Sequence, residues 1–132
     1  MTGGSQAIGK TICEVFAKEG AHVYFCARKQ EIGDATCKGI TDAGGIAEFA
    51  KVDVGQEEEL KAWIDSVGEK EGKIDIVVPN AAAFVFGKID DVTSADWDKI
   101  LSVNVKVRCQ PPPPQYTPSA CPCCIDGVES NG

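Results

Sequence analysis

A glycine-rich stretch near the start of the chain, from Thr2 to Gly9, most constrains what this sequence can fold into. It leads into a segment whose apolar residues recur on one helical face: Ile8, Ile12, Val15 and Phe16. Glycines let a backbone approach a pyrophosphate closely, and the start of a helix offers free N–H groups to it. Glycines before a helix are also common simply as a turn, so this stretch alone leaves both interpretations open.

The rest of the chain as far as residue 106 alternates between strand and helix patterns. Strands are predicted over 21–26, 46–53 and 73–78, the last with a near-continuous apolar run. Helices are predicted over 29–43, from Gln56 to about Val67, and from a cap at Thr93 or Ser94 through Val105. Strict alternation of this kind predicts an α/β fold with a parallel sheet, covered on both faces by helices.

Size and composition limit the kind of protein. The 132 residues suffice for one domain, and a net charge of -7 argues against nucleic acid or an anionic membrane as the main partner. There is no apolar run of membrane-spanning length and no signal segment at the start. Three isolated cysteines, Cys13, Cys26 and Cys37, have the pattern of buried thiols in a reduced compartment. We therefore expect a cytoplasmic protein.

Residues 107–132 differ sharply in composition. They hold six of the seven prolines and four cysteines without any apolar period, which predicts a disordered tail. Two functions could reside there. Pro113-Pro114-Gln115-Tyr116 is a P-P-x-Y sequence of the kind that WW domains bind. A zinc site is the other, although the spacing is poor for it and the only histidine, His22, is distant; its ligands would be Cys109, Cys121, Cys123 and Cys124.

Four stretches between residues 2 and 106 resemble, in order and spacing, motifs of the short-chain dehydrogenase/reductase family. They are the turn Thr2-Gly3-Gly4-Ser5-Gln6-Ala7-Ile8-Gly9, the pair Asp53-Val54, the run Asn80-Ala81-Ala82-Ala83 and the segment Ser102-Val103-Asn104-Val105. The resemblance implies an incomplete Rossmann-like domain over residues 1–106. It also implies a set of cofactor-binding residues: Thr2, Gly3, Ser5, Gln6, Ile8, Gly9, Asp53, Val54, Asn80, Ala81 and Ala82. Asn104 matches the family's catalytic-site asparagine.

Three positions depart from the family pattern. Ala7 stands where a glycine is usual, which adds a methyl group close to the expected cofactor. Pro79 and Ala83 replace the first and last residues of the N-N-A-G motif, and a proline there removes one backbone donor. We expect these changes to weaken the site without abolishing it.

Charge at the end of the first predicted strand bears on the choice of cofactor. NAD-preferring sites usually place a carboxylate there to bind the ribose hydroxyls. This strand ends in Cys26-Ala27-Arg28-Lys29, with no acid before Glu31. Arg28 can pair with a 2′-phosphate, which favours NADP over NAD. The alternative is that Arg28 and Lys29 are merely a solvated helix start.

The resemblance implies hydride transfer between a nicotinamide and an alcohol or carbonyl, through a tyrosine, a lysine four residues later and a serine. Of the catalytic residues only Asn104 is present. Tyr116 is followed at the fourth place by Ala120 and not by a lysine. Tyr24 and Arg28 have the spacing but belong to the predicted strand near the adenosine end of the cofactor. We therefore expect a fragment that keeps the cofactor-binding half and lacks catalysis, and its status as an enzyme stays open. The alternative is a non-enzymatic binding protein acting through its P-P-x-Y tail.

The family's central first strand would precede Thr2, and further strands would follow residue 106. Their absence from this sequence predicts an incomplete sheet and a marginally stable fold, as expected of a truncated or mis-spliced product. Complete homologues would act on a small carbonyl or alcohol, and a homo-oligomer remains open. Neither substrate nor oligomeric state follows from the residues present.

Overall fold

The structure, a computed structural model, describes residues 1–106. Two parallel strands, β1 (His22–Ala27) and β2 (Ile46–Lys51), lie side by side with His22 opposite Ile46 and Ala27 opposite Lys51. The α-helices of this part are α1 (Ala7–Lys18), α2 (Gln30–Asp42), α3 (Glu57–Glu71) and α4 (Ser94–Leu101). A short 3₁₀ turn, η1 (Ile89–Asp91), precedes α4, and a π-helical turn, η2 (Ser102–Lys106), follows it.

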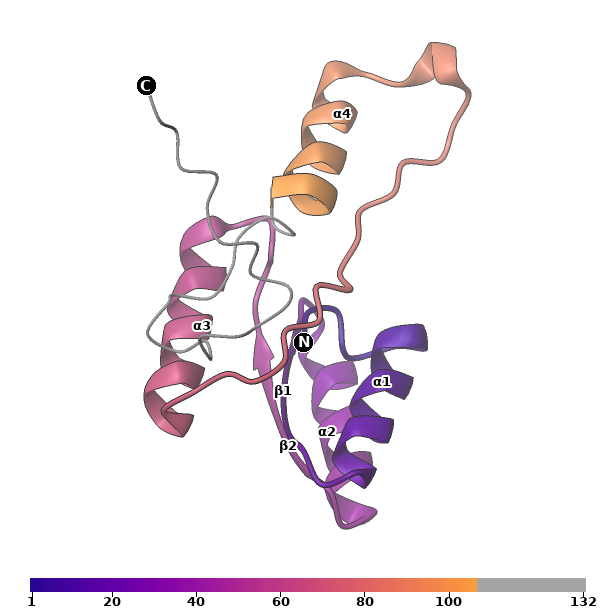
Figure 1. Ribbon diagram of the computed structural model, residues 1–132. Helices are drawn as coiled ribbons and strands as arrows, with labels where there is room; N and C mark the ends of the chain where they lie inside the picture. The colour runs from indigo at the N-terminus through magenta and orange to yellow at the C-terminus, as the bar shows by residue number, and fades with distance from the viewer. Residues whose placement is uncertain (107–132) are drawn as a thin grey trace, which may run out of the picture.

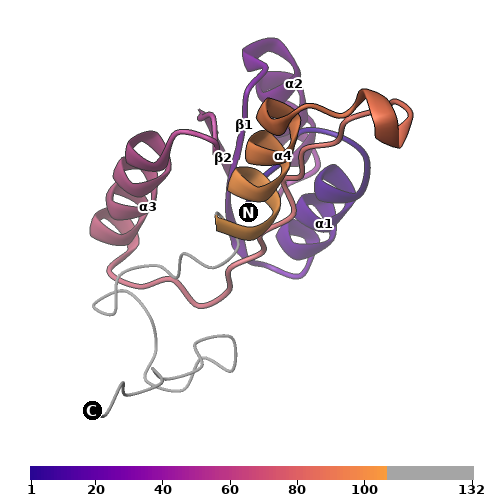
Figure 2. The ribbon, with the colours of Figure 1, turned by 90° about the horizontal axis from the view of Figure 1, so that it is seen from above.

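The helices lie on both faces of this small sheet. α1 and α2 cover one face and α3 the other, while α4 lies beyond the carboxyl ends of the strands (Figures 1 and 2). The predicted Rossmann-like arrangement, a parallel sheet between helices, is confirmed. None of the helices between residues 1 and 106 is long and apolar enough to cross a membrane.

The prediction of a third strand over residues 73–78 is wrong. Among residues 1–106 this segment is not part of the sheet. An isolated parallel bridge joins Thr2 to Pro79 directly after it, and the Val78 carbonyl accepts from the Thr2 N–H at 3.0 Å. Thr2 also bridges Cys26 of β1 in parallel, so Met1 and Thr2 lie between β1 and the 73–78 segment. A strand exists only where a neighbour satisfies its backbone, and within residues 1–106 no other strand pairs with most of this segment.

The buried face of α1 also differs from the predicted one. Ile8 is 72% exposed and Val15 is 50% exposed. The helix instead buries three small residues four positions apart: Gly9, Cys13 and Ala17. Small side chains let the helix axis approach β1 closely, and Cys13 and Ala17 join a core that also contains Val23, Phe25, Ile40 and Ala47.

A second core cluster fixes α3 to the other face of the sheet. Its buried members are Cys26, Val52, Val54 and Leu60. Trp63 and Ile64 of α3 pack against it, and so do Ala81 and Val103 from later in the chain. This cluster therefore joins the sheet to the two segments in which the sequence predicts site residues.

Local sequence signals account for how α3 and α4 begin. Three glutamates, Glu57 to Glu59, form the first turn of α3, where negative charge is favoured by the helix dipole. The predicted cap at Thr93 is confirmed, since its hydroxyl oxygen accepts from the Asp96 N–H at 3.3 Å. The Asp96 carboxylate in turn accepts from the Thr93 N–H at 3.0 Å, which completes a capping box.

Replacing either of two glycines of α2 by alanine should change stability in opposite directions. A Cβ at Gly33 would overlap the Phe49 ring of β2, whereas a Cβ at Gly39 would meet nothing. We expect Gly33→Ala to lower the free energy of unfolding by about 1–3 kcal/mol through overpacking. Gly39→Ala should raise it by roughly 0.5–1 kcal/mol through helix propensity. Urea titration followed by circular dichroism measures both, and equal effects at the two sites would contradict this account.

Several large apolar side chains are exposed to water, which is consistent with the marginal stability expected from the sequence. Phe84 is 70% exposed and Phe86 is 94% exposed, and half of Trp97, Leu101 and Val105 is open to water. We predict a broad thermal unfolding transition of low cooperativity and strong binding of a hydrophobic dye before unfolding. A sharp melt with calorimetric and van't Hoff enthalpies in agreement would show that the fold is not marginal.

Candidate functional site

The glycine turn begins where β1 ends. The Gly3 and Gly4 N–H groups both donate to the Cys26 carbonyl, at 2.9 and 3.3 Å, and Gly3 has a φ of +66° that favours glycine. The turn then packs on itself, because a Cβ at Gly9 would overlap the Gly3 carbonyl oxygen. Gly3 and Gly9 therefore lie so close together that position 9 has no room for a side chain.

Asn80 and Thr2 lock this turn to the segment after residue 78. The Asn80 side-chain amide donates to the carbonyl oxygens of Thr2 at 3.2 Å and Gly3 at 3.1 Å. The Thr2 hydroxyl oxygen accepts from the Ala81 N–H at 3.1 Å. The candidate residues Thr2, Gly3, Asn80 and Ala81 thus form one hydrogen-bonded unit, while Ala82 follows as an exposed residue.

The start of α1, directly after the turn, lies at the surface. Ser5 is buried, and its carbonyl accepts from the Thr36 hydroxyl at 2.9 Å, whereas Gln6 and Ile8 are exposed. Among the α-helices of residues 1–106, α1 is the one with neither a side-chain cap nor an acid in its first turn. Its first N–H groups have no partner within the helix, so this helix start can bind an anion.

A hollow of about 520 Å³ lies at the carboxyl ends of β1 and β2. Its lining combines two cations with two acids: Arg28, Lys51, Val52, Asp53 and Glu59. Asp53 is fixed by local bonds, since one carboxylate oxygen accepts from the Gly55 N–H at 3.0 Å and the Asp53 N–H donates to Glu59 at 3.0 Å. Val54 is instead buried in the core, 8% exposed, and contributes packing at this edge.

Lys51 is a candidate that the sequence analysis missed. It lies directly opposite Ala27 in the sheet, so it ends β2 beside the Arg28 that follows β1. The register between β1 and β2 brings these two cations to the same hollow. The sequence pattern predicts the two strands but not their register, so it could not have indicated Lys51. A phosphate group in the hollow would meet both.

Asn104 lies in the π-helical turn η2 and binds both backbone groups of one residue. Its side-chain oxygen accepts from the Ala83 N–H at 2.8 Å, and its amide donates to the Ala83 carbonyl at 2.9 Å. Asn104 therefore tethers the segment after Asn80 to the end of α4. π-helical turns within helices often mark functional sites, and this one replaces the regular continuation of α4 that was predicted through Val105.

Tyr24 lies away from these residues. Its hydroxyl donates to Glu71 at the end of α3, 2.6 Å, and the Lys70 ammonium lies 5.6 Å from its ring. Desolvation, followed by the bond to Glu71, raises the pKa of the Tyr24 hydroxyl. The predicted tail features, which are Tyr116 with its P-P-x-Y sequence and the cysteines from Cys109 to Cys124, lie outside the described residues.

The family model for short chain dehydrogenases matches residues 1–109. The chain belongs to this family. Similar curated proteins include the cyclopentanol dehydrogenase of Comamonas testosteroni, 31% identical over 106 residues that make up 80% of this chain and 42% of that protein. The 3beta-hydroxysteroid dehydrogenase of Mediterraneibacter gnavus is 34% identical over 80% of this chain and 38% of its own length. The chain thus spans about two fifths of the relatives that it matches.

Solved short-chain dehydrogenase structures share the fold. A metagenomic short-chain oxidoreductase in complex with NADP aligns with a TM-score of 0.77 at 32% identity, over 81% of this chain and 49% of that one. A short chain dehydrogenase from Burkholderia cenocepacia J2315, also in complex with NADP, aligns with a TM-score of 0.76 at 36% identity, over 81% and 44%. The family binds nicotinamide dinucleotides. The part of the chain that aligns with these structures includes the glycine turn and the carboxyl ends of β1 and β2.

The departure at Ala7 yields a prediction about this turn. Ala7 has a φ of +46°, in the left-handed region that costs a non-glycine residue roughly 1–2 kcal/mol. We expect Ala7→Gly to raise the free energy of unfolding by about 0.5–1 kcal/mol, after the larger unfolded-state entropy of glycine is subtracted. Ala35→Gly is the matched control, because Ala35 is an exposed alanine inside α2 and its substitution should be destabilising. Destabilisation by both changes, measured in urea, would show that Ala7 is unstrained.

Proposed function

We propose that residues 1–106 bind the adenosine and pyrophosphate part of a nicotinamide dinucleotide, with a preference for NADP. The observation that carries the proposal is the locked turn between Thr2 and Gly9, which presents the uncapped, acid-free start of α1 at the carboxyl end of β1. Free N–H groups and the helix dipole favour a pyrophosphate at such a place. The overlap that a Cβ at Gly9 would cause explains why this turn is built from glycine.

Arg28 and Lys51 support the preference for NADP. Both line the hollow at the strand ends, and the charge they offer there fits the 2′-phosphate of NADP better than the hydroxyls of NAD. Asp53 in the same hollow accepts a hydrogen bond from the Gly55 N–H. By its resemblance to the family's acidic residue it is the residue that we propose contacts the adenine ring. Two of the similar solved structures were determined in complex with NADP, which is consistent with this preference.

We further propose that this chain binds the cofactor without transferring hydride. When bound, a nicotinamide dinucleotide supplies or accepts the hydride, and the chain must provide a proton donor next to the reacting oxygen. Tyr24 is engaged by Glu71 at the end of α3, and no lysine follows it at the fourth place. Asn104 is present, but both of its polar groups bind Ala83. A complete relative would carry out alcohol or carbonyl oxidoreduction with residues that this sequence does not contain.

A titration with NADPH and NADH, followed by nicotinamide fluorescence, tests this function. We expect saturable binding that is tighter for NADPH, and no carbonyl-dependent loss of absorbance at the nicotinamide band. Arg28→Ala and Lys51→Ala should each weaken NADPH binding about tenfold, the equivalent of roughly 1.4 kcal/mol, and leave NADH binding nearly unchanged.

Lys29→Ala is the matched control, since Lys29 is exposed next to Arg28 but does not line the hollow. It should change NADPH binding by less than twofold, beyond the general effect of charge that added salt removes. Absence of binding for both dinucleotides would contradict the proposed function, and equal loss with all three variants would contradict a specific 2′-phosphate site. Turnover by the unmodified chain would overturn the proposal that it lacks catalysis.

A further inference from the structure

The hollow at the carboxyl ends of β1 and β2 contains charges of both signs that do not pair with one another. In the part of the chain that the structure describes, neither Arg28 nor Lys51 makes an ion pair or a side-chain hydrogen bond. The two acids are held by backbone groups instead, since Asp53 accepts from the Gly55 N–H and Glu59 from the Asp53 N–H, each at 3.0 Å. The cations are therefore available to a ligand, while the carboxylates stay fixed beside them.

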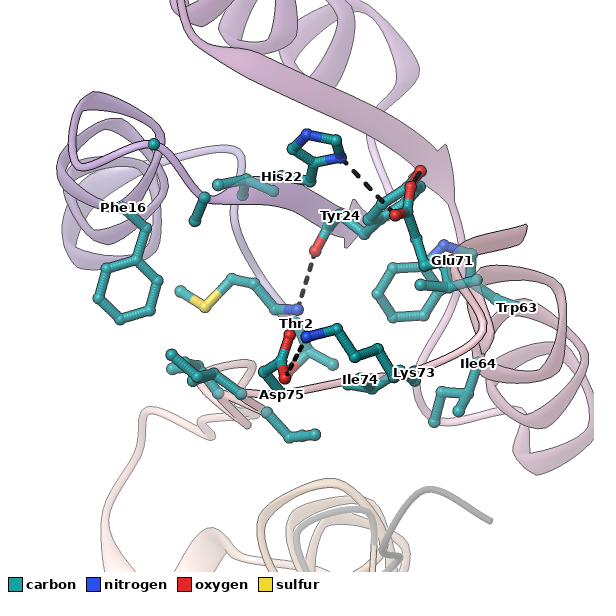
Figure 3. Close-up of a pocket in the computed structure, with 18 residues that line it drawn as sticks. Thr2, Phe16, His22, Tyr24, Trp63, Ile64, Glu71, Lys73, Ile74 and Asp75 are labelled. Atoms are coloured by element: carbon teal, nitrogen blue, oxygen red, sulfur yellow. Dashed lines mark hydrogen bonds and ion pairs between the residues drawn. The ribbon is translucent and has the colours of Figure 1, made fainter. Parts of the chain in front are cut away.

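Charged groups on another side of β1 show the contrasting arrangement. At the cavity of about 470 Å³ between β1 and residues 73–78, the Lys73 ammonium lies 2.9 Å from Asp75, and His22 lies 3.7 Å from Glu71 (Figure 3). Opposite charges at such distances cancel most of each other's field. The charges in the hollow do not cancel in this way, so each of them acts on a ligand that enters.

The fold carries Glu59 to this hollow from the first turn of α3. The Val52 N–H donates to the Ala27 carbonyl at 3.1 Å, which continues the pairing of β1 with β2 to the base of the hollow. Leu60 is 2% exposed and packs with Val52 in the second core cluster. Glu59 directly precedes this anchor, so the packing of α3 and the bond to Asp53 together set the position of its carboxylate.

A carboxylate beside two cations affects the two dinucleotides differently. The 2′-phosphate of NADP carries about two negative charges at neutral pH, so Arg28 and Lys51 attract it and Glu59 repels it. The ribose hydroxyl of NAD is neutral and can donate to a carboxylate. NAD-preferring sites usually place that carboxylate at the end of a strand, whereas in this chain α3 supplies it.

We infer that Glu59 is a specificity-determining residue, which opposes Arg28 and Lys51 and thereby reduces the preference for NADP. The inference rests on the proposed binding of a nicotinamide dinucleotide in this hollow. Two cations and two acids leave the hollow without net charge, so it admits both cofactors. Removal of the Glu59 charge shifts this balance toward NADP.

Glu59→Gln in the complete 132-residue chain tests this inference. Glutamine has nearly the same size and keeps an oxygen that accepts from the Asp53 N–H, so the variant removes the charge alone. In fluorescence titrations at low salt, the variant should bind NADPH about fivefold more tightly than the unmodified chain, and NADH no more tightly. Salt at about 0.5 M should reduce this gain to less than twofold, because Arg28, Lys51 and Glu59 are exposed to solvent.

Glu58→Gln is the matched control. Glu58 belongs to the same first turn of α3 and is exposed, but it does not line the hollow. It should change the ratio of the NADPH and NADH affinities by less than about twofold. An equal change of this ratio in both variants, or a gain in Glu59→Gln that salt leaves intact, would overturn the inference.

The same titrations separate this inference from the proposed function. Binding of both dinucleotides with a ratio that Glu59→Gln leaves unchanged would overturn the role of Glu59 and leave the proposed function standing. Absence of binding by the unmodified chain would overturn both.

Discussion

Backbone hydrogen bonds made by the first three residues hold this structure together. Met1 and Gly3 bond to β1, and Thr2 bonds to Val78 on the other side through its N–H and to Ala81 through its hydroxyl. A buried peptide group without a partner costs free energy comparable to a lost hydrogen bond. These bonds therefore connect β1 to residues 78–81, and they do so at the point where the glycine turn begins. The geometry of the candidate cofactor site depends on them directly.

The second constraint is the close approach of α1 to β1, which small residues make possible. A Cβ at Gly4 would lie 2.6 Å from the Phe25 Cβ and 2.9 Å from the Cys13 sulfur, so α1 can pack on β1 only with glycine there. Burial raises the pKa of the Cys13 and Cys26 thiols to about 11, so both stay protonated and act as small apolar groups. The same close packing places the start of α1 next to the end of β1, where an anion can reach its N–H groups. The packing of Gly4 against Phe25 and Cys13 thus also sets the position of the proposed anion site.

Local patterns in the sequence predicted the elements that depend on local interactions. The turn and the capped start of α4 at Thr93 both follow from short stretches whose residues favour them. The parallel pairing of β1 with β2 follows instead from the alternation of strands and helices along the chain. The strand predicted over residues 73–78 failed because pairing requires a neighbour, which no property of those six residues supplies. Lys51 was missed for a related reason, since its position beside Arg28 is set by the register between two strands. The inner face of α1 was misjudged because hydrophobicity favoured Ile8 and Val15, whereas close packing selected Gly9, Cys13 and Ala17.

Residues 1–3 form one short backbone segment that connects β1 to the glycine turn. At one end Met1 bonds to the Tyr24 carbonyl, and at the other Gly3 bonds to Cys26 and Asn80. Asn80 holds the turn through the Thr2 and Gly3 carbonyls, so a local opening of residues 1–3 would loosen that anchor. Regions with few buried contacts open at a lower free energy than the core does. The free energy of this local opening therefore sets an upper limit on how firmly the turn can hold the pyrophosphate proposed for it.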